Sequence, residues 1–227
     1  MHLYIDGPTE KEIKKFVSLV DGFTFNPSLF KKLGAKNYLG YAKKIIKKCK
    51  NKPVSIEVIA DKPVEMIRQA KIINELGKNV YVKIPITFTN GKSTIKVIEN
   101  LHNEGIKLNI TAIFTLNQIK RILPKIKNKK HILSVFVGRI YDCGKDGSKI
   151  MKEINRHVSK KSKCKTLWAS CRMSYDYIKA KEFKTNIITM TPSQIEKIKN
   201  FRLSLLEYSQ KTVQQFYNDA NKAKFKI

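Results

Sequence analysis

Short, almost continuously apolar runs alternate along the chain with longer segments in which apolar residues recur every three to four positions. Continuous apolar runs are typical of parallel strands that are covered on both faces. We predict eight such strands, at Leu3–Asp6, Gly22–Phe25, Val54–Ile59, Val80–Ile84, Leu108–Ile113, Ile132–Val137, Thr166–Ser170 and Asn186–Met190.

Helical periodicity fills the intervals between these runs, for example over Leu39–Cys49, Val64–Leu76 and Ser93–Glu104. Eight regular β–α units within about 200 residues predict an α/β fold, a closed parallel (β/α)8 TIM barrel. An open doubly wound sheet is the alternative. No Gly-x-Gly-x-x-Gly motif follows the first strand, and the regular spacing of the units also favours the barrel.

An extra helix follows the eighth unit, over about Leu203–Ala223, with apolar residues such as Leu206 and Val213. A surplus helix of this kind usually covers a barrel mouth or packs on a neighbouring subunit. No repeat, low-complexity tract or linker interrupts the chain. We therefore expect residues 1–227 to form a single domain, with 203–223 as an additional C-terminal helix.

The composition narrows the class of protein. A hydrophobic content of 42% with 9% aromatic residues excludes a disordered or collagen-like chain. No apolar run approaches the ~20 residues that a membrane span requires. The first residues, Met1–Asp6, carry no basic region followed by a long apolar stretch, so no secretion signal is expected. We expect a cytoplasmic protein with no membrane partner.

The chain is strongly basic, with 46 Lys and Arg against 18 Asp and Glu and a formal net charge of +28. Such a charge is compatible with a nucleic-acid partner. The basic pairs are, however, spread along the chain, and no usual nucleic-acid motif is present. We therefore favour solvated helix faces, whose field would also steer a phosphorylated substrate. A basic binding protein on a catalytically silent barrel remains the rival interpretation.

The four cysteines and four histidines lack the paired spacing of a zinc site. Reduced structural thiols are the simpler interpretation. We predict no metal and no cofactor.

Barrel enzymes carry their working side chains at the carboxyl ends of the strands. The polar residues at or near these ends are Asp6, Thr24, Asn26, Glu57, Lys83, Asn109, Thr111, Ser134, Arg139, Ser170 and Arg172. The eighth run offers Thr189 and Thr191 as weaker candidates.

Lys83 is the most informative of these residues because it interrupts the apolar strand Val80–Ile84, where an unpaired ammonium group is costly. Desolvation and nearby cations lower the pKa of a lysine, and the neutral amine attacks carbonyl groups to form a Schiff base. Asp6 and Glu57 lie on the same barrel face, and carboxylates can move the protons of imine chemistry. A structural ion pair of Lys83 with these carboxylates is the competing explanation.

Two arginines on adjacent predicted strand ends suggest a phosphate site. Arg139 follows Gly138, and Arg172 lies two residues after Ser170. Two guanidinium groups with a hydroxyl and loop amides suit a phosphate group. Barrel enzymes also often bind phosphate near strands seven and eight. Either arginine alone is better explained as a surface or salt-bridge residue.

Taken together, these segments resemble the transaldolase and fructose-6-phosphate aldolase family, in its short branch. The resemblance runs in order from the first strand to about Pro192. The motifs that carry it are Tyr4-Ile5-Asp6, Asp21-Gly22-Phe23-Thr24-Phe25-Asn26-Pro27-Ser28-Leu29, Val82-Lys83-Ile84-Pro85, Asn109-Ile110-Thr111, Ser134-Val135-Phe136-Val137-Gly138-Arg139-Ile140 and Ala169-Ser170-Cys171-Arg172.

The resemblance implies a transaldolase that moves a dihydroxyacetone unit between sugar phosphates through a Schiff base on Lys83. Glu57 and Thr111 would position a water that shuttles protons, and Asp6 would take the proton of the donor hydroxyl. The remaining implied residues bind substrate. Asn26 and Asn109, with Ser134 nearby, would hold the three-carbon fragment, and Arg139, Ser170 and Arg172 would bind phosphate. Thr24 and Phe136 are also expected to bind substrate.

Two positions separate transferases from simple aldolases in this family. Glu57 and Phe136 match the transferase pattern, whereas the aldolase branch typically carries glutamine and tyrosine there. The alternative is a Schiff-base aldolase that releases free dihydroxyacetone or acts on an unusual sugar. Phe25 replaces a usual threonine and would narrow the donor pocket if its ring faced the mouth.

Short members of the family commonly form ring-shaped oligomers, so a pentamer or decamer is expected.

Overall fold

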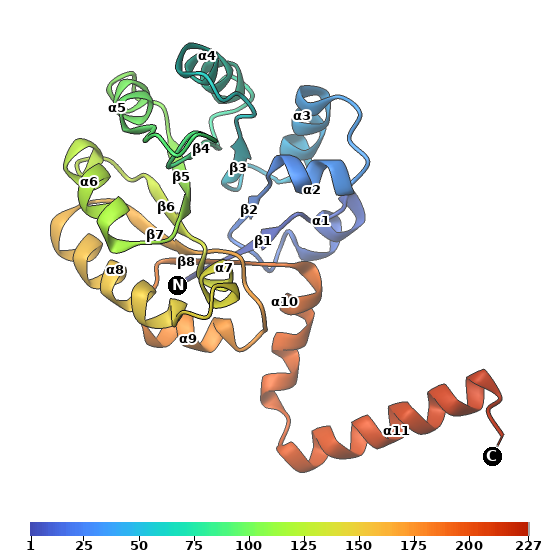
Figure 1. The fold of residues 1–227 in the computed structure, drawn as a ribbon. Coiled ribbons are helices and arrows are strands. Elements are labelled where there is room, and N and C mark those ends of the chain that lie inside the picture. Colours follow the sequence, from blue (N-terminus) through green and yellow to red (C-terminus); the bar gives the residue numbers. More distant parts are fainter. Residues whose placement is uncertain (227) are drawn as a thin grey trace.

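The computed structural model describes residues 1–226 and confirms the predicted (β/α)8 barrel. Eight parallel strands pair in sequence order, and β8 closes the barrel against β1 (Figure 1). The strands are β1 (His2–Asp6), β2 (Gly22–Thr24), β3 (Val54–Glu57), β4 (Val80–Pro85), β5 (Leu108–Ile113), β6 (Ile132–Val135), β7 (Lys165–Trp168) and β8 (Ile187–Met190).

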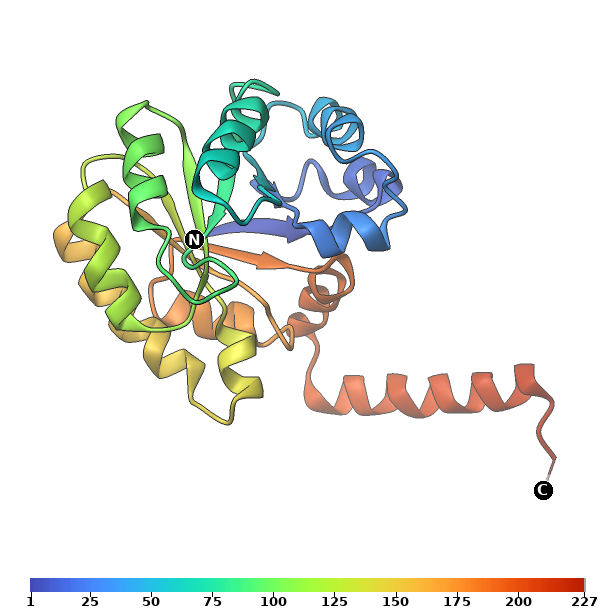
Figure 2. The same cartoon turned by 45° about the horizontal axis from the view of Figure 1, so that its top comes forward.

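Helices surround the strands (Figures 1 and 2). They are α1 (Glu10–Phe16), α2 (Pro27–Lys32), α3 (Tyr38–Lys48), α4 (Pro63–Asn74), α5 (Ile95–Asn103), α6 (Leu116–Ile126), α7 (Val137–Asp142), α8 (Gly147–Lys161), α9 (Asp176–Glu182) and α10 (Pro192–Ile198), followed by a short 3₁₀ helix at Lys199–Arg202 and by α11 (Leu205–Ala223).

Alternation along each strand divides the apolar residues into two cores, because successive strand side chains point to opposite faces. In β4, Val80 and Val82 belong to the large core between the strands and the helices, whereas Tyr81 packs against the inner cluster of the barrel. That inner cluster includes Tyr4, Ile132 and Leu167. The inward positions nearer the carboxyl ends are mostly polar, and they form the upper part of the barrel interior.

Four predicted strands end before their predicted limits: the second ends at Thr24 and the seventh at Trp168. The third ends at Glu57, and the sixth ends at Val135 because Val137 begins α7. Val137 and Ile140 are both buried on that helix. A short apolar run has the same appearance in a buried strand and in a buried helix turn, so the sequence pattern does not separate them.

Side chains at the strand exits fix where two rim helices begin. The Asn26 side chain accepts a hydrogen bond from the backbone N–H of Leu29 and caps α2, with Pro27 at its first position. Thr191 and Gln194 form a capping box at the start of α10. Both helices therefore start directly beside the polar end of the barrel.

The C-terminal helix α11 forms close to the predicted range, but it extends away from the barrel (Figures 1 and 2). None of its residues is buried, and Leu206 is 83% exposed. The expectation that the helix covers the mouth of its own barrel is therefore wrong for the single chain. Within residues 1–226, no helix combines the length and the apolar character that crossing a lipid bilayer demands.

Candidate active site

A cavity of about 190 Å³ opens at the carboxyl ends of the strands. Its lining contains most of the side chains expected to work on a substrate. These are Asp6, Thr24, Asn26, Lys83, Thr111, Ser134, Phe136, Arg139, Ser170 and Arg172. Of the predicted site residues, Glu57 and Asn109 alone do not line the cavity wall, and both lie beside residues that do.

Lys83 reaches the cavity with only 5% of its surface exposed. Its Nζ lies 3.0 Å from Glu57 Oε2 and donates a hydrogen bond to the Phe25 carbonyl oxygen at 3.2 Å. Strand register places Glu57, Lys83 and Asn109 side by side on β3, β4 and β5. The buried amine thus has a carboxylate on one side and an open cavity on the other.

Asp6 ends β1 and accepts a 2.6 Å hydrogen bond from the Thr24 hydroxyl on the paired strand β2. Burial raises the pKa of the Asp6 carboxyl, and the negative charge of Glu57 adds to the rise. The positive charge of Lys83 and the Thr24 hydrogen bond act in the opposite direction. Asp6 therefore lies within the electrostatic influence of Lys83, while Glu57 forms the direct ion pair with it.

The Thr111 hydroxyl lines the cavity and has no hydrogen-bond partner in the described part of the chain, although the atom is fully buried. A buried, unpaired hydroxyl is costly, so its presence indicates a position meant for a water or a substrate oxygen. The next residue, Ala112, has a left-handed backbone (φ 57°), and the register between β5 and β6 shifts at this point. Such bulges re-aim side chains next to active sites.

Asn109 lies behind the cavity in a buried hydrogen-bond chain. Its Nδ2 donates to the Ser55 hydroxyl at 3.0 Å, and its Oδ1 accepts from Ser134 at 2.6 Å. Ser134 itself reaches the cavity. Asn109 is therefore held in one orientation, in a position to fix Ser134.

The two predicted arginines follow the β6 and β7 ends and line the same cavity. Arg139 lies on α7, where its guanidinium carbon is 5.4 Å from the centre of the Phe136 ring. Arg172 donates to the Ser170 hydroxyl at 3.1 Å and forms a two-point ion pair with Asp142. Both guanidinium groups line the cavity, as a phosphate site requires.

Gly138 allows the loop after β7 to lie directly against α7. A Cβ atom at this position would lie 1.7 Å from the carbonyl oxygen of Ser170, which is far inside van der Waals contact. Ser170 adopts a left-handed backbone (φ 63°), an unusual conformation that occurs at functional sites. The glycine of the Val-Gly-Arg segment is thus required so that the loop after β7 can close onto α7.

The cavity also contains Thr189 and Thr191, which were only weaker candidates in the sequence, and Cys171 and Gln194, which were not candidates. Thr189 lies on β8 at the same level as the selected residues of other strands, so its position at a strand end was an available signal. Asp142, which pairs with Arg172, had no such signal because the pairing joins residues 30 positions apart.

Phe25 does not narrow the cavity. Its side chain is fully buried in the outer core, with its ring centre 5.3 Å from that of Phe30 on α2. Only its carbonyl oxygen takes part in the site, as the acceptor for Lys83.

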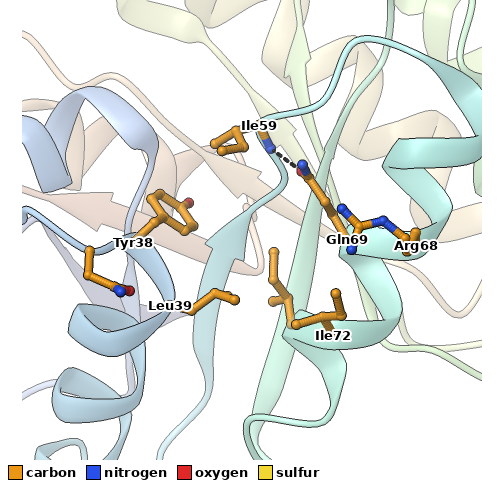
Figure 3. A pocket seen from close by; sticks show the side chains of 8 residues that line it. Tyr38, Leu39, Ile59, Arg68, Gln69 and Ile72 are labelled. Atoms are coloured by element: carbon orange, nitrogen blue, oxygen red, sulfur yellow. Dashed lines mark hydrogen bonds between the residues drawn. The ribbon is translucent and has the colours of Figure 1, made fainter.

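A second cavity, of about 380 Å³, lies on the outside of the barrel between α3 and α4 (Figure 3). Apolar side chains such as Leu39, Ile59 and Ile72 line most of it. Its Gln69 side chain already accepts hydrogen bonds from the backbone of Ile59 and Ala60. The residues that line this groove include no carboxylate, lysine, histidine or cysteine, whereas Asp6, Lys83 and Cys171 line the cavity at the barrel mouth.

Comparisons with known proteins agree with this geometry. The family model for transaldolase and fructose-6-phosphate aldolase matches residues 3–227. A probable transaldolase of Methanococcus vannielii is 34% identical over 207 residues, covering 90% of this chain and 92% of that protein. A probable transaldolase of Thermoplasma volcanium is 35% identical over 198 residues, covering 84% of each chain.

Solved structures share the fold at low sequence identity. N-acetylneuraminate lyase from Mycoplasma synoviae superimposes with a TM-score of 0.57 at 14% identity, over 96% of this chain and 80% of that one. A structure described as native KDPGal gives a TM-score of 0.55 at 11% identity, over 83% of this chain and 80% of that one. These structures show the fold alone. The match of the family model to residues 3–227 and the similarity to the probable transaldolases show that the chain belongs to the transaldolase/fructose-6-phosphate aldolase family.

Proposed function

We propose that this protein transfers a dihydroxyacetone unit from a ketose phosphate to an aldose phosphate through a Schiff base on Lys83. The observation that carries the proposal is the position of Lys83 Nζ. It is buried, it is 3.0 Å from Glu57, and it borders a cavity that Asp6 and two arginines also line. A purely structural ion pair accounts for Glu57 but not for the cavity or for the unpaired Thr111 hydroxyl.

Imine formation begins when Lys83 loses a proton and its amine attacks the ketone carbon of the donor. Loss of water from the resulting carbinolamine gives the iminium ion. Glu57 and Thr111 flank the position where protons must move, and together they position the water that shuttles these protons. Support for this role comes from the short contact of Glu57 with Nζ and the free hydroxyl of Thr111.

Carbon–carbon cleavage follows when Asp6 removes the proton from the donor hydroxyl beyond the bond that breaks. The electron pair of that bond moves into the iminium, an aldehyde leaves, and a three-carbon enamine remains on Lys83. Burial of the Asp6 side chain raises its pKa, and a carboxylate with a raised pKa is a better base than an exposed aspartate. The enamine then adds to the acceptor aldehyde, and hydrolysis of the new imine releases the product.

The remaining polar side chains bind the sugars. Ser134, fixed by Asn109, together with Asn26 and Thr24, holds the hydroxyl groups of the three-carbon fragment. Arg139, Ser170 and Arg172 hold the phosphate of donor and acceptor, and they lie on one side of the cavity on α7 and the loop after β7.

Phe136 favours transfer over simple aldol cleavage. Its ring lines the cavity and carries no hydroxyl that would activate water against the enamine. Activity that depends on an aldose phosphate acceptor supports a transferase. Release of free dihydroxyacetone at the same rate without acceptor would instead assign the protein to the aldolase alternative.

Borohydride trapping tests the central step. With fructose 6-phosphate present, borohydride should inactivate the protein and attach a three-carbon fragment to the peptide that contains Lys83, as read by peptide mass. A Lys83→Met variant should not be labelled, and Lys165→Met, at the opposite end of the barrel, is the matched control. A label on any other lysine would defeat the assignment. No label with any ketose phosphate, combined with salt-sensitive nucleic-acid binding, would support the rival of a silent basic barrel.

We also propose that the protein assembles into a homo-oligomer, a pentamer or decamer, through α11. Leu206, Val213 and Tyr217 are spaced seven and four residues apart, which places them on one helix face. All three are exposed in the single chain. A helix with an unpartnered apolar stripe is stabilised by packing, and a second copy of this chain supplies that packing.

A further inference from the structure

Thr189 on β8 is linked to Asp6 by two hydrogen bonds through Thr24, and it has no role in the chemistry proposed above. Its Oγ1 lies 2.6 Å from Thr24 Oγ1, and Thr24 in turn donates to Asp6 Oδ1 at 2.6 Å. Strands β2 and β8 pair with β1 on its two sides, and the two hydroxyls meet inside the barrel. Thr24 and Thr189 are 3% and 4% exposed, so bulk water competes little for these bonds.

The directions of the two hydrogen bonds follow from the number of protons. A threonine hydroxyl has one proton to donate, and an ionised carboxylate has none. Thr24 must therefore donate its proton to Asp6, and Thr189 must donate its own to Thr24. The order Thr189 to Thr24 to Asp6 is the arrangement that gives the ionised carboxylate its hydrogen bond.

We propose that Thr189 is a positioning residue that orients the Thr24 hydroxyl toward Asp6 and so holds Asp6 as an ionised proton acceptor. The inference rests on the role proposed for Asp6. Without the Thr189 proton, Thr24 is free to turn its hydroxyl away, and the polarisation that one hydrogen bond transmits to the next is lost.

Other groups also face Asp6 and bear on its titration. Lys83 on β4 favours the ionised form, whereas Glu57 on β3 opposes it. The Cys171 thiol after β7 also lies near enough to interact, and burial raises its own pKa well above the ordinary value, so it stays neutral. None of these groups is removed when Thr189 is changed, so a shift in Asp6 titration can be ascribed to the hydroxyl chain.

Infrared titration of the full chain gives the test, with the band of the protonated Asp6 carboxyl identified by its loss in Asp6→Asn. Thr189→Val keeps nearly the same shape and removes the donor. It should move the midpoint of this band to higher pH by a three- to tenfold change in proton affinity, the range for one hydrogen bond. Thr189→Ser should restore the wild-type midpoint. Thr166→Val, which alters a buried threonine hydroxyl bonded to Asn186, is the matched control.

An unchanged midpoint in Thr189→Val, or an equal shift in Thr189→Ser, would overturn the proposal. Thr189→Ala is the second variant if the valine variant does not fold. In turnover, the acid limb of kcat/KM should shift in the same direction, while borohydride trapping on Lys83 at high pH persists. Absence of trapping in the wild type would refute the proposed function instead, and the infrared titration would still decide the role of Thr189.

Discussion

At the scale of single residues, the site depends on a few side chains whose chemistry is set by burial. Lys83 is buried and Asp6 is half-buried, and the Glu57 carboxylate contacts the amine. The sequence analysis identified Lys83 because a charged residue interrupted an apolar strand. It could not decide whether Asp6 or Glu57 pairs with the amine, because that depends on side-chain geometry across three strands.

Asp6 is the residue whose loss should slow bond cleavage most selectively. In Asp6→Asn, cleavage should fall by roughly 10²–10⁴-fold, the usual contribution of a positioned base. Trapping of the donor on Lys83 should persist, because imine formation does not use Asp6. Single-turnover measurements of aldehyde release check the expectation, and undiminished release would assign the proton transfer to another group.

The pH dependence of carbon–carbon cleavage by the wild type should follow the ionisation of Asp6. Asp6 must be ionised to accept a proton, and burial raises its pKa above the ordinary value of 3.8. The rate of cleavage should therefore decline on acidification at a pH above that value. A profile that stays flat down to pH 3.8 would contradict the role of Asp6 as the base.

Gly138 should tolerate no side chain. In Gly138→Ala the new carbon overlaps the Ser170 carbonyl oxygen, so the loop that carries Ser170 and Arg172 must move. We expect a loss of stability of about 1–3 kcal/mol and a raised KM for phosphorylated substrates. Gly40→Ala is the control, because Gly40 is exposed on α3 and its added carbon meets nothing closer than the Asn37 side chain, at 3.2 Å. Unchanged thermal unfolding and KM in Gly138→Ala would show that the close approach is not needed.

At the scale of elements, alternation along the strands produces the polar interior. The same strand that presents Val80 and Val82 to the helices presents Tyr81 and Lys83 to the interior. Polar residues at strand ends are readable from sequence, and the family resemblance added Phe136. Ten of the twelve predicted site residues line one cavity. The residues at which strands end and α7 begins were harder to predict, because an apolar run can continue from a buried strand into a buried helix turn.

The amino-terminal end of the barrel contains a buried histidine pair that should make folding pH-dependent. Leu108 N–H donates to His131 Nδ1 at 3.2 Å, so the ring proton of His131 lies on Nε2, 2.8 Å from His102 Nδ1. Burial, with the nearby His102 and Lys129, lowers the pKa of His131 to about 4. Folding therefore holds His131 neutral below the pH at which an unfolded histidine takes up a proton.

The unfolded chain binds this proton near pH 6.5, so it binds more protons than the folded chain between pH 6.5 and about 4. The free energy of unfolding should fall over that window as the pH decreases, by up to about 3 kcal/mol from this group. Urea unfolding at several pH values checks the slope. His131→Asn, which keeps an acceptor for Leu108, should reduce this slope. An unaltered slope in His131→Asn would contradict the prediction.

At the scale of the whole molecule, the net charge and the C-terminal helix α11 are the features that bear on substrate approach and on association of copies. Lysine pairs such as Lys43–Lys44 and Lys160–Lys161 lie exposed on the outer helices, as solvated helix faces do. With a net charge of +28, the surface field favours approach of anionic sugars. The same charge opposes assembly, so in the proposed oligomer the apolar face of α11 would have to provide the attraction between copies.

Disrupting that face should dissociate the assembly without unfolding the barrel. Leu206→Glu combined with Val213→Glu places charge on the apolar stripe, and α11 buries no residue of its own. We expect a smaller particle by light scattering, with barrel circular dichroism retained. Lys211→Gln, on the opposite side of the helix, is the control. A wild type that is already monomeric, or a double variant of unchanged size, would refute assembly through α11.

The amino-acid sequence alone determined the barrel, the order of its strands and which polar residues lie at the carboxyl ends of those strands. These features follow from local periodicity and from the fixed geometry of parallel strands. Only the tertiary structure decided that Glu57 contacts Lys83, that Thr189 reaches Asp6 through Thr24, and that α11 leaves the barrel uncovered. Those outcomes depend on distances between residues far apart in the chain, and periodicity carries no information about such distances.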